Sequence, residues 1–246
     1  MKTILFTGGT GLVATPQVRH FLAKGDRVVI TYRHEEKLAA LGEGDLVAIK
    51  VPDLLAPGAV DGLVAELRSR GIFPDCLVNN AVDGRWHWPD ADGHVSEENF
   101  INHYRLNVYV PYDLSWKLVH EPGGKLRRIV NISSMYGVIP YDPNLYEHPE
   151  TETSIHYATA KAALIHLTKE LAIRFKDRGV SVNAVSYGGV EGRASDEFRR
   201  KFERVTPLRR MMKPEETVPA VEFLLEESSG YMTGQNLIVD GGRTVW

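Results

Sequence analysis

Cysteine is almost absent from this chain, which has one, Cys76, among its 246 residues. One thiol forms no intrachain disulfide and no cysteine-based zinc site, so a disulfide-stapled scaffold and a structural zinc module are excluded. Cys76 begins an apolar run and is expected to be inert packing. The acidic run that starts at Asp90 has Ile101, not Glu, at the twelfth position that a calcium loop requires, so no metal site is predicted.

Long apolar runs and an excess of one charge are also missing. No stretch approaches the roughly 20 apolar residues of a membrane span, and the run after Lys2 is too short for a secretion signal. Lys and Arg number 29 against 32 Asp and Glu, a net charge of −3, whereas non-specific nucleic-acid binding needs a basic domain. We therefore expect a cytoplasmic protein with neither membrane nor nucleic-acid partners.

Short apolar runs alternate with helix-length amphipathic segments along the whole chain. Strands are expected at residues 2–7, 27–32, 46–51, 76–79, 126–133, 181–186 and 236–239, and helices at 15–25, 60–70, 99–120, 155–178, 194–206 and 215–227. The helix at 99–120 is expected to bend at Pro111. Continuously apolar strands that alternate with helices predict one α/β domain over residues 1–246, a doubly wound parallel sheet with helices on both faces. Ligands of such sheets bind beyond the carboxyl ends of the strands.

A glycine-rich turn follows the first predicted strand. Gly8, Thr10, Gly11 and Leu12 lie in it, and a helix comes next, which is the arrangement that binds the diphosphate of a dinucleotide. No acid for a ribose 2′-hydroxyl follows the second strand before Glu35, and Arg33 stands there instead. An arginine at this point accommodates a 2′-phosphate, so NADP(H) is predicted over NAD(H).

Polar residues follow the next two strands. Asp53 and Leu54 come after the third strand, where the carboxylate could accept from an adenine amino group or cap the next helix. Asn79, Asn80 and Ala81 end the fourth strand, where the amides could hold loop backbone and a ribose or form a plain Asx turn.

The fifth strand leads to Ser134, and the helix after it carries Tyr157 and Lys161. Residues four apart lie on one face of a helix. A lysine ammonium beside a phenol favours the phenolate, so we expect Lys161 to lower the pKa of Tyr157, as a general acid for a carbonyl oxygen requires.

Together with later motifs, these residues resemble the short-chain dehydrogenase/reductase family in its compact single-domain branch. The resemblance spans residues 2 to about 243 and adds three motifs, Arg105–Val108, Val182–Ser186 and Thr233–Gly242. It implies a catalytic set of Asn107, Ser134, Tyr157 and Lys161, in which Tyr157 donates the proton, Ser134 binds the same oxygen, Lys161 also binds the nicotinamide ribose, and Asn107 holds a relay water. It further implies cofactor contacts at Tyr187, Gly188 and Val190, and a homodimer or homotetramer.

The chain departs from the family pattern at several points. Gly11 gives the glycine turn a spacing typical of the extended branch, while Val82 and Tyr187 replace a glycine and a proline. Ser134 and Tyr157 are 23 positions apart, about ten more than is usual in the compact branch that the chain resembles. We therefore expect residues 139–154 to be an insertion at the mouth of the site.

The insertion points to a polar, hydroxyl-rich substrate, and it resembles that of members tied to bacterial surface-sugar pathways. We expect substrate contacts from Trp86, Tyr141, Tyr146 and His148. Residues 191–213, which the family uses as a substrate lid, hold eight basic and four acidic residues. They could attract an anionic substrate or form a solvated helix face. The eight are Arg193, Arg199, Arg200, Lys201, Arg204, Arg209, Arg210 and Lys213.

The leading hypothesis is an NADP-dependent oxidoreductase that transfers hydride between nicotinamide and a polar carbonyl or alcohol, such as a sugar or sugar acid. The glycine spacing leaves a second hypothesis, a cofactor-retaining epimerase or dehydratase of a nucleotide sugar. A third, a non-catalytic dinucleotide-sensing protein, does not require Asn107, Ser134, Tyr157 and Lys161 together, so this set argues against it.

Overall fold

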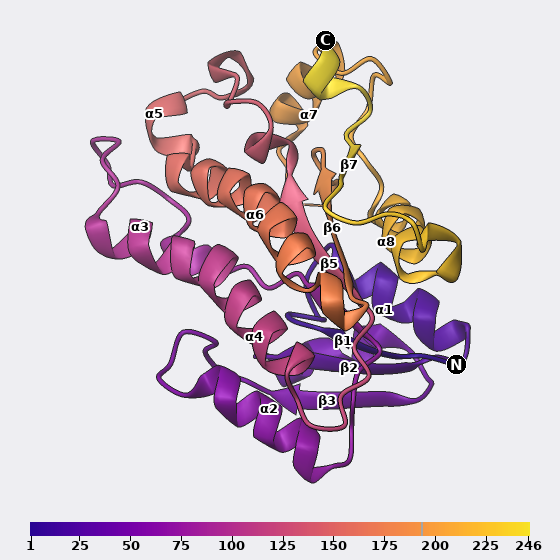
Figure 1. Cartoon of the computed structure of the whole chain (residues 1–246). Helices are drawn as coiled ribbons and strands as arrows, with labels where there is room; N and C mark the ends of the chain where they lie inside the picture. Colours follow the sequence, from indigo (N-terminus) through magenta and orange to yellow (C-terminus); the bar gives the residue numbers. More distant parts are fainter. Residues whose placement is uncertain (193) are drawn as a thin grey trace.

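A single seven-stranded parallel sheet organises the chain, whose computed structural model describes residues 1–192 and 194–246 (Figure 1). The strands are β1 (Thr3–Phe6), β2 (Arg27–Tyr32), β3 (Leu46–Lys50), β4 (Cys76–Asn79), β5 (Arg128–Ser134), β6 (Ser181–Tyr187) and β7 (Asn236–Val239). Their order in the sheet is β3-β2-β1-β4-β5-β6-β7, with every pairing parallel. The predicted doubly wound α/β fold is confirmed.

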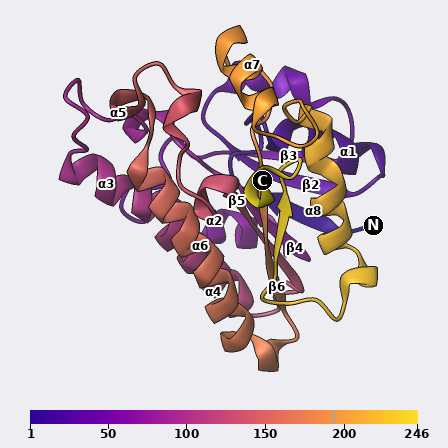
Figure 2. The same ribbon diagram turned by 90° about the horizontal axis from the view of Figure 1, so that it is seen from above.

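Helices cover both faces of the sheet, as Figure 2 shows from above. The α-helices are α1 (Ala14–Ala23), α2 (Ala59–Ser69), α3 (Glu97–Tyr104), α4 (Val110–Val119), α5 (Pro149–Glu152), α6 (Ile155–Arg174), α7 (Asp196–Arg204) and α8 (Val218–Leu225). One apolar cluster packs α2, α4 and α6 on one face, and another packs α1 and α8 on the other. Within β1, Leu5 faces the first cluster, while Ile4 and Phe6 face the second. Burial on both faces explains why the strands read as unbroken apolar runs.

The parallel arrangement brings all carboxyl strand ends to one edge, where α5, α7 and the C-terminus gather over β5 and β6 in Figure 1. The strand order reverses between β1 and β4, because the chain runs outward to β3 and then returns to the other side of β1. Such a switch point leaves a crevice between diverging loops. The sequence motifs that follow β1, β2, β3 and β4 all lie at this crevice.

The bend expected at Pro111 stays a prediction, and the helix is distorted close to this residue. The distortion lies earlier, in a π-helical turn over Arg105–Tyr109 between α3 and α4. Pro111 lies just after this turn, where the chain is already helical and the N–H of Val110 donates to the Arg105 carbonyl. The missing N–H of Pro111 therefore removes a hydrogen bond from a continuous helix. The π-helical turn contains Asn107, and such turns often mark functional sites.

Gly137 provides a test of how tightly α6 lies against the end of β5. It sits in the turn Met135–Gly137, and a Cβ there would lie 2.8 Å from the carbonyl carbon of Lys161. We expect Gly137→Ala to lower the free energy of unfolding by about 1–3 kcal/mol, because backbone would have to move. Gly62→Ala, in α2 with open space around it, is the matched control and should raise it by about 0.5–1 kcal/mol. Urea unfolding gives the free energy of unfolding of both variants. Equal changes for Gly137→Ala and Gly62→Ala would contradict the close contact between α6 and the turn at Gly137.

Candidate active site

A cavity of about 260 Å³ lies at the switch point, between the segments that follow β1, β2, β3 and β4. Nine of the residues predicted to bind cofactor line it together: Gly8, Thr10, Gly11, Leu12, Arg33, Asp53, Leu54, Asn80 and Ala81. They come from four separate segments, so the sequence order alone did not require them to meet.

The glycine turn is braced against the end of β4. The Thr7 hydroxyl accepts hydrogen bonds from the backbone N–H groups of Asn80 and Ala81, at 3.0 and 3.1 Å. The side-chain amide of Asn80 donates to the Gly8 carbonyl at 3.0 Å, so it holds loop backbone. Gly8 has φ +65°, and a Cβ there would lie 3.1 Å from the Ala81 Cα. No side chain at Gly8 therefore covers the backbone of the turn beside the cavity. Backbone N–H groups exposed in this way suit the diphosphate of a dinucleotide.

The other predicted cofactor residues at this cavity have protein partners. Asp53 accepts from the Leu55 N–H at 2.8 Å in a local turn, and it does not cap the next helix, α2, whose N-cap is Gly58. Arg33 forms an ion pair with Asp83, a buried carboxylate four residues after β4 that also binds Arg85. Asp83 was not among the predicted site residues. Its contact with Arg33 arises only because β2 and β4 lie on either side of β1 in the sheet.

Ser134, Tyr157 and Lys161 come together where α6 crosses the end of β5. A hydrogen bond joins the Ser134 side chain to the Tyr157 phenol. The Lys161 ammonium lies 5.6 Å from the centroid of the Tyr157 ring and donates to the Ile132 carbonyl at 2.8 Å. The Ser133 hydroxyl donates to the Lys161 carbonyl at 3.0 Å. Two adjacent residues of β5, Ile132 and Ser133, therefore hold Lys161 and with it α6.

The expected lowering of the Tyr157 pKa is wrong for the groups of this chain by themselves. Burial raises the pKa of Tyr157, and the hydrogen bond with Ser134 offsets only part of that effect. Burial also lowers the pKa of Lys161 to about 7, which weakens the positive charge that the prediction relied on. At neutral pH Tyr157 therefore carries its proton, the state in which a phenol can act as an acid.

Asn107 is held by a histidine that the sequence analysis missed. The Asn107 amide nitrogen lies 2.9 Å from His103 Nδ1 and donates to the His103 carbonyl at 2.9 Å. Burial, followed by His156, His87 and Lys161, lowers the pKa of His103 to about 3, so the ring is neutral. Asn107 and Lys161 line one small cavity, as the resemblance implies for a shared water. The spacing of four residues was the signal available in the sequence.

The segment after β4 lies over Tyr157. The His87 and Tyr157 rings are 5.2 Å apart in an edge-on contact, and the ring of His103 lies 5.7 Å from Tyr157. His156 Nε2 donates to the Trp86 carbonyl at 2.5 Å, which ties this segment to α6. Trp86 packs against the core cluster, and the guanidinium of Arg85 lies 4.3 Å above its ring.

Residues 139–154, which are predicted to be an insertion, pack on themselves through Tyr141 and Tyr146 and on α7 through Tyr146 and Phe198. Tyr141 stacks on Tyr136 with ring centroids 3.8 Å apart, and the hydroxyls of Tyr136 and Tyr146 are 2.7 Å apart. Asp142 lies 3.0 Å from Arg243 near the C-terminus. His148 is exposed, and its backbone N–H donates to Glu152. Much of the polar surface expected to meet substrate thus has partners within the chain, and the substrate contacts stay predictions.

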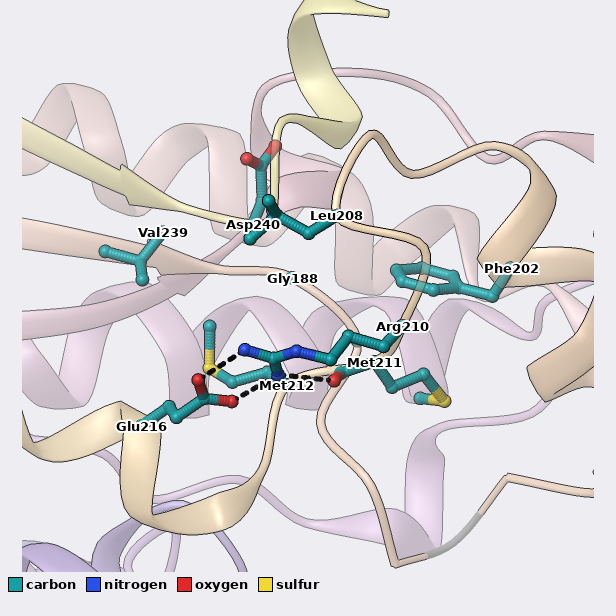
Figure 3. A pocket seen from close by; sticks show the side chains of 11 residues that line it. Gly188, Phe202, Leu208, Arg210, Met211, Met212, Glu216, Val239 and Asp240 are labelled. Atoms are coloured by element: carbon teal, nitrogen blue, oxygen red, sulfur yellow. Dashed lines mark hydrogen bonds and ion pairs between the residues drawn. The ribbon is translucent and has the colours of Figure 1, made fainter.

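The three predicted cofactor residues at the end of β6 and just after it lie outside the large cavity. The Tyr187 side chain is buried and its hydroxyl donates to the Thr217 carbonyl, so only its backbone is available to a cofactor. Val190 forms a β-bridge with Met212, and Gly188 lines a second cavity of about 100 Å³. In Figure 3, Arg210 lies along that cavity and pairs with Glu216, at 2.6 Å.

Several basic residues of the predicted lid are likewise paired. Arg199 pairs with Asp196, and Lys201 lies 3.0 Å from Glu197. Arg193 lies outside the described residues. These pairs are what a solvated helix face would form, and they leave the attraction of an anionic substrate as a prediction.

Within residues 1–192 and 194–246, no helix is long and apolar enough to cross a bilayer. The same residues contain no group of three or more His, Cys, Asp or Glu side chains placed to hold a metal ion.

Comparisons with known proteins agree with this geometry. The sequence model described as "Enoyl-(Acyl carrier protein) reductase" matches residues 13–244. A 3-oxoacyl-(acyl-carrier-protein) reductase of Rickettsia bellii is 30% identical, with 98% of this chain and 96% of the relative covered. A galactitol 2-dehydrogenase of Rhizobium johnstonii is 30% identical over 98% of this chain and 94% of its own. The chain belongs to the short-chain dehydrogenase/reductase family.

Solved structures of similar proteins hold nicotinamide cofactors. A 4-hydroxyisoleucine dehydrogenase complexed with NADH has a TM-score of 0.87 and 25% identity, with 100% of both chains covered. A short-chain dehydrogenase from Leptospira borgpetersenii with bound NAD+ has a TM-score of 0.84 and 30% identity, covering 99% of this chain and 92% of its own. As a member of this family, the chain has the fold of an NAD(P)-dependent oxidoreductase, and these neighbours share it over nearly their full length.

Lys161 gives the site a pH-dependent stability that can be measured. Its folded-state pKa of about 7 lies below the ordinary value of 10.5, so between these values the unfolded chain binds more protons. The cost of burying the charge is present below pH 7 and relieved as the pH rises. We expect the stability of Lys161→Met relative to wild type to fall from pH 7 to pH 10, by up to about 1.4 kcal/mol per pH unit. Urea unfolding of both proteins across this pH range is the measurement. Lys169→Met, at an exposed lysine of α6, controls for the loss of a charge. A stability difference between Lys161→Met and wild type that does not change with pH would contradict the lowered pKa of Lys161.

Proposed function

We propose that this protein is an NADP(H)-dependent oxidoreductase that transfers hydride between nicotinamide and a polar carbonyl or alcohol, such as a sugar or sugar acid. The observation that carries the proposal is that Ser134, Tyr157 and Lys161 come together, and that Lys161 lines a small cavity sharing Ala81 and Leu106 with the large cavity of the glycine turn. Binding alone would not require this phenol, serine and lysine to lie together.

In this proposal each residue of the site has a defined task. Nicotinamide, when bound, supplies or accepts the hydride. Tyr157 donates its proton to the carbonyl oxygen, and Ser134 places a hydroxyl where negative charge develops. Lys161 holds a proton close to Tyr157 and can return it after turnover. Asn107, fixed by His103, lies with Lys161 at the small cavity through which a proton would be passed on.

The polar substrate is supported by the surroundings of Tyr157 and by the relatives. His87 lies edge-on against the Tyr157 ring, and Tyr141 of the predicted insertion lies close enough for the two phenols to affect each other electrostatically, so polar groups stand near the phenol. One relative is a galactitol dehydrogenase and one structural neighbour is a 4-hydroxyisoleucine dehydrogenase. Trp86, Tyr141, Tyr146 and His148 remain the proposed contacts, and an anionic group would be received by the lid.

We also propose that the chain works in the cytoplasm as a homodimer or homotetramer. Exposed apolar side chains on α3 and α6, which pack side by side, support assembly. Ile101 is 47% exposed, Ile155 59% and Ile173 71%, and a partner chain packed on these helices would cover such apolar side chains.

Replacing the phenol tests the chemistry. We expect Tyr157→Phe to lower turnover at least about 100-fold and to change NADPH binding less than threefold, because only the proton donor is lost. Turnover is followed by nicotinamide absorbance with polyols, keto-sugars, sugar acids and hydroxy acids. Tyr231→Phe, at a fully exposed tyrosine, is the control. Equal activity of Tyr157→Phe and wild type would refute the proposal.

Removing Arg33 tests the cofactor preference. A charged hydrogen bond to phosphate is worth about 1.5–3 kcal/mol, so Arg33→Ala should weaken NADPH binding about 10- to 100-fold and NADH binding much less. Arg27→Ala, at the opposite end of β2 and paired with Asp45, is the matched control. Calorimetric titration with both cofactors is the measurement. Equal losses for NADPH and NADH would remove Arg33 from this role.

A further inference from the structure

Four charged side chains form a continuous row of ion pairs at the large cavity, which three of them, Arg33, Asp53 and Asp83, line. Arg33 pairs with Asp83, Asp83 accepts from Arg85 Nε at 2.9 Å, and Arg85 Nη2 lies 3.2 Å from an Asp53 oxygen. Two guanidinium groups thus face two carboxylates, and their formal charges cancel. Arg33 therefore presents much less net positive charge to the cavity than its sequence position indicates.

Asp83 is the fixed member of this row. Its side chain is only 6% exposed, against 37% for Arg33 and 50% for Arg85. Its second oxygen accepts from the Arg85 backbone N–H at 3.0 Å. Burial favours the protonated acid, but the hydrogen bonds and charge of Arg85 and the charge of Arg33 hold the pKa of Asp83 below its usual range. The group is a carboxylate at neutral pH.

The Arg33–Asp83 pair joins the two sides of the cavity. Arg33 follows β2 and Asp83 follows β4, and these strands lie on either side of β1 in the sheet. The acid that usually follows β2 in an NAD site is missing here, and the segment after β4 brings a carboxylate to the same arginine instead.

We propose that Asp83 is a specificity-determining residue for the cofactor. Its carboxylate repels the 2′-phosphate of NADP(H) at Arg33, so it reduces the ratio by which the site binds NADP(H) more tightly than NAD(H). The inference rests on the proposed function, in which Arg33 receives that phosphate. A phosphate on Arg33 would share one guanidinium with the Asp83 carboxylate, and like charges this close repel. NAD(H) has a hydroxyl at that position and escapes the repulsion.

The test uses 2′,5′-ADP and 5′-AMP, which carry the two ribose patterns without the nicotinamide, so binding is read by calorimetry independently of catalysis. We expect Asp83→Asn to raise the ratio of the 5′-AMP Kd to the 2′,5′-ADP Kd about tenfold at low ionic strength, with a smaller rise in 0.5 M salt. The amide keeps the shape of the side chain and an acceptor for the Arg85 N–H.

Two further variants sharpen this test. Asp45→Asn removes the same charge from an aspartate–arginine pair at the other end of β2 and should leave the ratio unchanged. Arg85→Gln removes the half-exposed guanidinium that pairs with Asp83, so the Asp83 carboxylate is then balanced by Arg33 alone. The ratio of the 5′-AMP Kd to the 2′,5′-ADP Kd should therefore fall about threefold. This variant tests the proposal even if Asp83→Asn does not fold.

The outcomes separate this inference from the proposed function. A wild-type chain that binds neither nucleotide would overturn both. Binding by wild type with a ratio that Asp83→Asn leaves unchanged or lowers would overturn the role of Asp83 alone. An Arg85→Gln ratio that stays level or rises would overturn it as well.

Discussion

The contact between α6 and the end of β5 is the constraint on which the site depends. Lys161 donates to the Ile132 carbonyl, Ser133 donates back to the Lys161 carbonyl, and Gly137 leaves room for the helix backbone. Because β5 ends at Ser134 and Tyr157 lies one helical turn before Lys161, this contact sets the serine against the phenol. The insertion between them can then vary in length, since its two ends are fixed by the sheet and the helix.

Burial of Tyr157 and Lys161 has a chemical consequence. It shifts both groups toward their neutral forms, raising one pKa and lowering the other. A protonated phenol is ready to reduce a carbonyl, whereas oxidation of an alcohol needs the phenolate and a neighbouring cation to support it. At neutral pH the site therefore holds a protonated phenol, which is the form that can donate to a carbonyl oxygen.

The sequence predicted the fold well because its signals are local and ordered. Apolar runs and glycine stops placed the strands, and the motifs after β1 to β4 indicated which residues line one cavity. It could not show that Arg33 meets Asp83, since that contact depends on strands that are distant in the chain. Nor could spacing reveal burial, which reverses the expected shift of Tyr157 and places the Tyr187 side chain in the core.

The large cavity is lined by Leu106 and by four segments that only the native sheet brings together, at residues 8–13, 31–37, 51–54 and 80–84. Whatever nucleotide binds there binds the folded chain and not the unfolded one. By mass action, a free concentration 100 times Kd would add about 2.7 kcal/mol to the stability of the whole domain. The lifetime of this enzyme against proteases is thereby coupled to the supply of its own cofactor.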